Sequence, residues 1–433
     1  MTEKRQKNTY LWPFILVTCC FALWGFANDI TNPMVKSFSR IFRMSVTDGA
    51  LVQVAFYGGY FAMAFPAAMF IRKHSYKSGL LIGLALYAIG ALMFIPAVGT
   101  GNYYPFLIAY FVLTCGLSFL ETSANPFILS LGDKASATRR LNLAQSFNPI
   151  GSLAGMWVAM NFIQARMNPL GTSERALLPD EEFEALKAAD LSVVVKPYVA
   201  IGLVILALLV LMLFTKMPLA VKTGMHDLRL RATIGRLWRN ATYRYGVLAQ
   251  FFYVGAQITC WTFIIQYGTQ VFMAEGMAEQ AAEIASQRLN IIAMVLFCAS
   301  RFVCTWLMKY VTPTKILSAF AAMAALLLLM VMLVSGRVGL YSLVGVSAFM
   351  SLMFPTIYGL ALGGVGDDTE IGSAGLIMAI LGGSLLPPLQ ALIIDGGHMG
   401  LSFIVPFVCF VVVLVYAIIV GKNEKILQNT GVA

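Results

Sequence analysis

The sequence is poor in charged residues, which make up only 12% of its 433 positions. Soluble domains carry about 25% charged residues, so water cannot surround most of this chain. The sequence has no Gly-x-x-x-x-Gly-Lys-Ser/Thr motif, the usual phosphate-binding loop of ATP-driven proteins. Its three histidines lie in expected loops or at helix ends, where they cannot form a proton relay through a membrane. These absences exclude a soluble protein and a pump driven by ATP.

Cysteine gives no sign of a redox or metal site. All seven cysteines fall within long apolar runs, where a free thiol behaves as a small apolar side chain. No nucleophile–base pair and no cluster of metal ligands stands out elsewhere in the sequence. We therefore expect no enzyme activity, no bound metal and no cofactor.

Hydrophobic residues are abundant instead, at 59% of the chain. Apolar runs long enough to cross about 30 Å of hydrocarbon recur from end to end. They predict an all-α integral membrane protein with twelve transmembrane helices, and short polar connections leave eleven or thirteen open. The expected spans are 11–35, 48–71, 79–98, 104–131, 141–164, 193–215, 245–271, 288–309, 314–335, 339–363, 371–394 and 401–421.

The net charge of +10 does not indicate nucleic-acid binding, because basic segments alternate with neutral or acidic loops. By the positive-inside rule the basic segments face the cytoplasm, which places both termini there, as an even number of helices also requires. The longest basic stretch divides the spans six and six. We therefore expect an N-terminal six-helix bundle over 1–215, a cytoplasmic basic linker over 216–244 and a C-terminal six-helix bundle over 245–433.

Two connecting segments carry further expectations. Within the linker, apolar residues at helical spacing opposite arginines predict a short helix over 227–238 that lies on the membrane surface. The acidic segment over 165–192 is expected to be external. A solvated connector is favoured there over a partial cap on the entrance.

Internal repetition is indicated by two acid-and-proline patterns. Asp29 precedes Asn32-Pro33, and Glu121 precedes Asn125-Pro126, in the first and fourth expected spans. Those spans hold corresponding places in two three-helix units, and carriers built from such repeats bind substrate near the middle of the membrane. Proline inside a spanning helix frees a carbonyl and bends the axis. We therefore expect Pro33, Pro126 and Pro355 to have structural or gating roles.

Three charged residues lie well inside the expected spans, namely Asp29, Glu121 and Arg301. A charge at mid-bilayer costs about 2.5–3.5 kcal/mol on the mildest scale, and it marks an ion or substrate pathway by default. A carboxyl group that is neutral in a closed cavity and ionised in an open one suits proton coupling. Glu121 and Asp29 are therefore the expected proton-coupling residues, and Arg301 is expected to be structural or gating.

Amides and tryptophans gather around these acids. Amides donate and accept hydrogen bonds at once, which suits adjacent hydroxyls, and an indole ring offers a flat apolar face to a sugar. A neutral polyol fits this set better than an anion or a lipophilic cation. The expected substrate-binding residues are Trp24, Asn28, Asn32, Asn125, Gln145, Asn148, Gln257 and Trp261.

Six motifs spread over nearly the whole chain carry a family resemblance. They are Phe21-Ala-Leu-Trp-Gly-Phe-Ala-Asn28, Ala55-Phe-Tyr-Gly-Gly-Tyr-Phe61, Leu120-Glu-Thr-Ser-Ala-Asn-Pro-Phe127, Arg140-Leu-Asn-Leu-Ala-Gln-Ser-Phe-Asn148, Tyr253-Val-Gly-Ala-Gln257 and Ser347-Ala-Phe-Met-Ser351. On these motifs the sequence resembles the fucose–galactose–glucose:proton symporters of the major facilitator superfamily.

The resemblance implies two six-helix bundles, alternating access, and symport of a neutral sugar, with L-fucose favoured, and a proton through a bacterial inner membrane. It matches Glu121 to the family's central glutamate, Gln145 and Asn148 to its amides in the fifth span, and Trp24 and Asn28 to its first-span pattern. It also implies a working monomer.

One departure keeps alternatives open. Proton-coupled relatives read Ala-Asn-Asn-Leu-Asn-Asp in the first span with the coupling aspartate last, whereas here Asn32 holds that position and the acid is Asp29. Sodium coupling of glucose or galactose transport is the alternative, since Asp29, Asn32 and a carbonyl freed near Pro33 offer oxygen ligands. A membrane sugar sensor that does not transport is a further alternative.

Overall fold

A computed structural model describes residues 2–31, 34–44, 51–168, 170, 172–217, 230–334 and 336–429. Helices account for most of these residues, and no strand occurs among them. The chain divides into two compact units. The first holds Met1–Leu131 and Phe147–His226, and the second holds Gly132–Ser146 and Asp227–Ala433.

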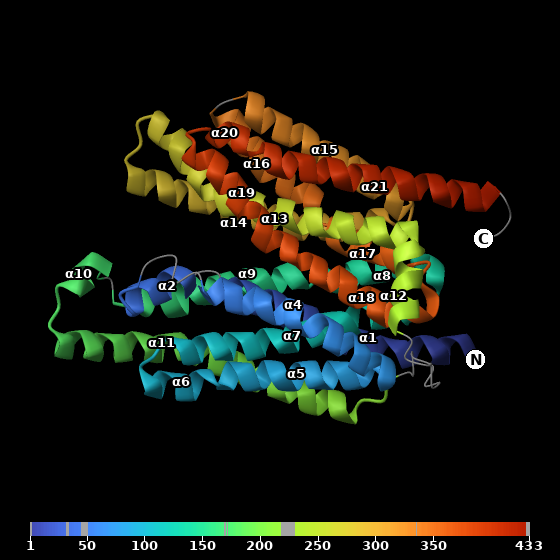
Figure 1. Ribbon diagram of the computed structural model, residues 1–433, viewed down its shortest axis with the longest axis horizontal. Helices are drawn as coiled ribbons and strands as arrows, with labels where there is room; N and C mark the ends of the chain where they lie inside the picture. The colour runs from blue at the N-terminus through green and yellow to red at the C-terminus, as the bar shows by residue number, and fades with distance from the viewer. Residues whose placement is uncertain are drawn as a thin grey trace. The chain divides into compact units, whose positions relative to one another are not determined.

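Each unit is a bundle of helices (Figure 1). The first contains α1 (Thr2–Thr31), α2 (Met34–Ile41), α4 (Leu51–Lys73), α5 (Tyr76–Leu92), α6 (Phe94–Thr100), α7 (Tyr104–Ser130), α9 (Asn148–Val158), η2 (Ala159–Ile163), η3 (Gln164–Arg166), α10 (Thr172–Ala176) and α11 (Asp180–Phe214). The second contains η1 (Lys134–Ser136), α8 (Ala137–Gln145), α12 (Leu230–Arg239), α13 (Ala241–Ala274), α14 (Glu279–Leu307), α15 (Pro313–Leu333), α16 (Arg337–Met350), α17 (Met353–Leu362), η4 (Gly366–Asp368), α18 (Thr369–Met378), η5 (Ala379–Leu381), α19 (Gly382–Asp395), α20 (Met399–Ser402) and α21 (Ile404–Asn429).

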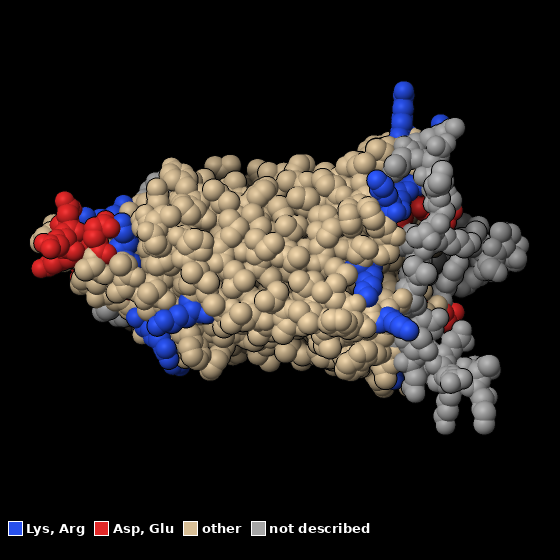
Figure 2. Space-filling model, turned by 90° about the horizontal axis from the view of Figure 1, so that it is seen from below, with Lys and Arg blue, Asp and Glu red and all other residues tan. Residues whose placement is uncertain are grey.

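Among the described residues, 11 helical stretches are long and apolar enough to cross a membrane. They correspond to eleven of the twelve expected spans. The remaining span, 141–164, is present as a broken helix made of α8, α9 and η2, none of which is long enough alone. Figure 2 shows a face on which charged side chains gather at two ends with a broad uncharged zone between them, as a membrane-spanning protein requires.

Prolines cause two of the breaks. Proline has no amide hydrogen, and its ring clashes with the carbonyl four residues earlier. Helix α16 ends just before Ser351, which is four residues before Pro355, and α17 begins at Met353. The expectation that Pro355 breaks this span is confirmed. Likewise α8 ends at Gln145, four residues before Pro149.

Of the other two prolines that were expected to have structural or gating roles, only Pro126 is among the described residues. Pro126 lies inside the continuous helix α7, so it does not break that span. Pro33 lies outside the described residues, as does Asn32.

Glycines let α1 and α9 approach to backbone contact. A Cβ atom on Gly151 would lie 1.7 Å from the Ala22 carbonyl oxygen, and one on Gly25 would lie 2.0 Å from the Asn148 carbonyl oxygen. Only glycine fits at these two positions. The contact sets Asn148, the first residue of α9, against the C-terminal part of α1.

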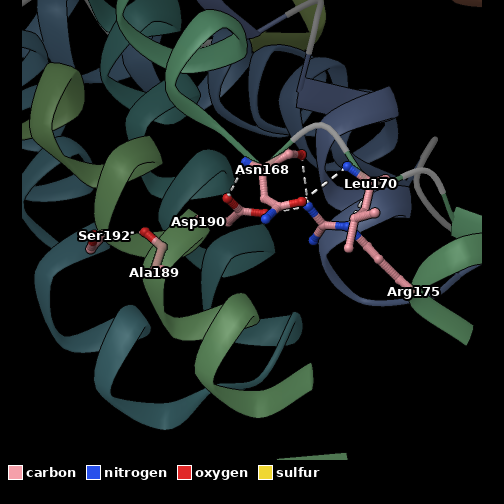
Figure 3. A network of polar contacts seen from close by, with 6 residues as sticks. All are labelled: Asn168, Leu170, Arg175, Ala189, Asp190 and Ser192. Atoms are coloured by element: carbon pink, nitrogen blue, oxygen red, sulfur yellow. Dashed lines mark hydrogen bonds and ion pairs between the residues drawn. The ribbon is translucent and has the colours of Figure 1, made fainter. Parts of the chain in front are cut away.

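Most described residues of the acidic segment over 165–192 are exposed or partly exposed, as expected of a solvated connector, but the segment also contains helices and a buried ion pair. Arg175 and Asp190 form an ion pair at 2.5 Å with side-chain exposures of 0% and 3%. Figure 3 shows that the Arg175 guanidinium also donates to the carbonyls of Asn168 and Leu170, at 3.1 and 2.9 Å. The Asn168 amide N–H donates to Asp190 Oδ1 at 2.9 Å. Sequence reading missed this because the partners meet only after α10 and α11 form.

We expect Asp190→Asn to lower the free energy of unfolding by about 3 kcal/mol, because it leaves Arg175 buried without its counter-charge. Thermal unfolding in detergent measures the effect. Asp180→Asn is the matched control, since Asp180 is fully exposed and 3.9 Å from Arg43 Nη1. Equal melting temperatures for the two variants would show that the buried pair contributes nothing.

The helix expected in the linker is present as α12. Its Arg236 side chain donates to Asp368 at 2.7 and 2.8 Å, and Thr233 donates to the same carboxylate at 3.1 Å. Hydrogen bonding to Asp368 raises the pKa of Arg236 above its usual range. These bonds tie α12 to the rest of the second unit. The expected helix residues before Leu230 lie outside the described residues.

Candidate functional site

Glu121 lies at the centre of the first unit. Its helix, α7, runs between α4 and α5 (Figure 1) and is buried along most of its length. Glu121 has 0% exposure, and neither carboxyl oxygen has a hydrogen-bond partner among the described residues. Asn125, one turn further along, is also completely buried. A carboxyl group in this position is stable only when it is neutral or when another molecule supplies its hydrogen bonds.

The second expected coupling residue, Asp29, lies near the end of α1 with 8% exposure. Its charge interacts with the Tyr57 hydroxyl on α4. Asn28 beside it is partly buried. Asp29 is therefore a buried acid with a different neighbour from Glu121.

Trp24 and Asn148 are brought together on the first unit. The Asn148 side-chain amide donates to the Phe21 carbonyl at 3.2 Å. The Phe21 ring stacks on Trp24 with ring centroids 5.7 Å apart. Trp24 remains partly exposed.

Two tyrosines on α4, Tyr57 and Tyr60, also belong to this group of residues. The sequence analysis did not identify a role for either. Tyr60 has 3% exposure, and its hydroxyl has no hydrogen-bond partner among the described residues. It lies beside the Trp24 indole and interacts electrostatically with Glu121. Both tyrosines belong to the motif Ala55-Phe-Tyr-Gly-Gly-Tyr-Phe61, whose i, i+3 spacing was the available signal.

The second unit holds the other aromatic residue expected to bind substrate. The Trp261 indole N–H donates to Ser347 Oγ at 3.2 Å, and its ring meets Phe297 edge-on with centroids 4.9 Å apart. Gln257 lies one turn away on α13 and is partly buried. Gln250, lower on the same helix, is completely buried, and its amide has no hydrogen-bond partner among the described residues.

Arg301 satisfies two carbonyls that prolines leave without amide partners. Its Nε donates to the Ser351 carbonyl at 2.6 Å, and its Nη1 donates to the Gln145 carbonyl at 3.0 Å. Each acceptor lies four residues before a proline, Pro355 or Pro149, and so has no amide donor in its own helix. The guanidinium also lies 4.6 Å from the centre of the Phe297 ring. Arg301 therefore fixes α8 against α14 and the break between α16 and α17.

The structure groups the predicted site residues by unit. The first unit holds Trp24, Asn28, Asp29, Glu121, Asn125 and Asn148, and the second holds Gln145, Gln257, Trp261 and Arg301. Gln145 is the last residue of α8 and Asn148 is the first residue of α9, on either side of the break at Ser146 and Phe147. Buried acids beside amides, indoles and hydroxyls can bind hydroxyl groups and exchange a proton.

The chain is similar to known transport proteins along its whole length. Residues 17–380 match the family model described as Major Facilitator Superfamily. An L-fucose-proton symporter of Haemophilus influenzae is 47% identical over 436 residues, covering 98% of this chain and 100% of that protein. An L-fucose-proton symporter of Escherichia coli is 35% identical over 416 residues, covering 95% and 94%. The crystal structure of the transporter FucP in the outward conformation has a TM-score of 0.86 at 35% identity, covering 95% and 99%.

Proposed function

The chain belongs to the major facilitator superfamily, and we propose that it imports L-fucose together with a proton. Two relatives named as L-fucose-proton symporters match it over 95% or more of its length. The single observation that carries the proposal is Glu121, a completely buried acid without a partner among the described residues. Such a group gives a carrier a titratable centre.

Transport proceeds by alternating access. In the outward-open state Glu121, or Asp29, takes a proton from the outside, and a neutral carboxyl group removes most of the cost of closing the site away from water. Sugar binding then accompanies the change to the inward-open state, where the proton is released. An ionised and empty site resists closure because a bare carboxylate would be enclosed, and this couples sugar to proton.

Sugar recognition rests on the two tryptophans and the amides. Trp24 and Trp261 offer ring faces to the apolar side of the sugar, and amide side chains bond its hydroxyls. We assign these contacts to Asn28, Asn125, Gln145, Asn148 and Gln257, with Asn32 as a further candidate. Arg301, Pro126 and Pro355 support the helices that carry them.

By the positive-inside rule, the basic segments favour an orientation with both termini on the cytoplasmic side of a bacterial inner membrane. The protein acts as a monomer, since each chain carries both bundles of the fold and a complete set of site residues.

Uptake of labelled L-fucose into vesicles that contain only the purified protein tests the function. We expect accumulation when the outside is made more acidic than the lumen, and none without the pH step. Unlabelled L-fucose should compete more strongly than D-galactose or D-glucose. Uptake that follows a sodium gradient and ignores the pH step would contradict the proposal, as would binding without any uptake.

A further inference from the structure

Three buried polar atoms near the centre of the first unit have no hydrogen-bond partner among the described residues. They are the two carboxyl oxygens of Glu121 and the hydroxyl of Tyr60, on α7 and α4. Glu121 is 0% exposed and Tyr60 is 3% exposed. Unpaired buried polar groups are costly, so a cluster of them calls for an explanation.

The helices that carry these side chains, α4 and α7, are in contact at this level. Ser118, three residues before Glu121 on α7, donates from its hydroxyl to the Tyr60 carbonyl at 3.0 Å. Next to it, a Cβ on Gly59 would lie 2.0 Å from Thr114 Oγ1, so the two helices touch there. Thr114, Ser118 and Glu121 share one face of α7 by their i, i+4, i+7 spacing, and that face meets α4 at Tyr60.

The groups around Tyr60 are acids or neutral donors. Its charge interactions are with Glu121 on α7, Tyr57 on α4 and Tyr87 on α5, and the indole of Trp24 on α1 lies beside it. Asp29 on α1 interacts with Tyr57. None of these groups is basic, so they can stabilise an ionised Glu121 only through their hydroxyl and N–H donors.

We propose that Tyr60 is the positioning residue of the coupling site. Neither side chain has a hydrogen-bond partner among the described residues, and a rotation of the two side chains lets the Tyr60 hydroxyl donate to ionised Glu121 and accept from protonated Glu121. A tyrosine hydroxyl can do both by rotating, whereas the Trp24 N–H can only donate. Tyr60 thereby orients the carboxyl group in both protonation states and sets the acidity at which coupling occurs. The inference rests on the proposed function of Glu121 in proton-coupled sugar transport.

The test is the pH profile of L-fucose exchange in vesicles without a gradient. Tyr60→Phe keeps the ring and removes one donor to ionised Glu121, which favours the protonated form. We expect the midpoint of the profile to move to higher pH by about one unit, which corresponds to the loss of one hydrogen bond to a charged group. In a Glu121→Gln background, Tyr60→Phe should cause no such shift.

Tyr87→Phe is the matched control. Tyr87 is also completely buried, but its hydroxyl already donates to the Leu23 carbonyl at 2.9 Å. It should change thermal stability and leave the midpoint unchanged. An unshifted midpoint in Tyr60→Phe overturns the inference, and so does a Tyr60→Phe protein that no longer folds, because the hydroxyl would then be structural. If Glu121→Gln itself keeps the wild-type profile, the proposed function of Glu121 fails first.

Discussion

Glu121→Gln will abolish accumulation of L-fucose against its gradient while leaving exchange of sugar for sugar. Glutamine keeps the shape and hydrogen-bonding capacity of a protonated glutamate but cannot release a proton. The site can therefore close on sugar, as in the protonated carrier, and the energy of the proton gradient is not transmitted. Uptake into vesicles with an imposed pH step measures the first effect, and exchange at equal pH measures the second.

Two further variants sharpen this prediction. Glu275→Gln is the matched control, because Glu275 is exposed and pairs with Arg337 at 2.9 Å, away from any buried site. It should accumulate sugar like the wild type.

The variant Asp29→Asn tests whether the acid on α1 also carries the proton. Full accumulation by Glu121→Gln and its loss in Asp29→Asn would assign the coupling to Asp29 and contradict the role given to Glu121.

Arg301→Met will slow transport about tenfold or more and loosen α8. Methionine fills much of the same volume but donates no hydrogen bonds, so the carbonyls of Gln145 and Ser351 lose their partner. Hydrogen bonds to charged groups contribute about 1.5–3 kcal/mol each, and about 1.4 kcal/mol corresponds to a tenfold change in rate. The Gln145 carbonyl closes α8, so the loss of its bond to Arg301 should free the end of this helix.

Hydrogen exchange provides the structural measurement for this second prediction. Amide protons over 137–145 should exchange faster in Arg301→Met than in the wild type. Arg337→Met serves as control, because the Arg337 side chain is 57% exposed and pairs with Glu275 on the surface. Unchanged exchange over 137–145, together with a wild-type transport rate, would show that Arg301 does not hold α8 in place.

The spans and the buried acids could be predicted from the sequence because each has a strong local signal. Residues 104–131 were expected as a span, and α7 covers Tyr104–Ser130. Glu121 was identified because a single carboxylate within such an apolar stretch has a large desolvation cost. Both inferences need only hydropathy and position along one helix.

The break between α8 and α9 was missed, although the sequence carried its signal. The hydropathy of the span 141–164 is an average over all its residues. It does not reveal the loss of a single backbone hydrogen bond. The signal was the pair Asn148-Pro149, because a proline disfavours helical geometry in the residue before it. As a result, Gln145 ends one helix and Asn148 begins the next, where a single continuous span was expected.

Contacts between residues that are far apart in the sequence could not be predicted, for a different reason. Arg301 was recognised as a deep cation, but its acceptors are backbone carbonyls, and any residue type provides those. The ion pair of Arg175 and Asp190 forms only when α10 folds back toward α11. Tyr60 was part of a recognised motif, yet its proximity to Glu121 depends on how α4 packs on α7.

Proton movement driven by sugar tests the central claim most directly. Vesicles containing the purified protein and a trapped pH-sensitive dye receive L-fucose from outside, with no initial pH difference. The wild type should acidify the lumen as sugar enters, in the same buffer with or without sodium, and Glu121→Gln should not. Sugar entry into the wild-type vesicles without acidification would contradict the account.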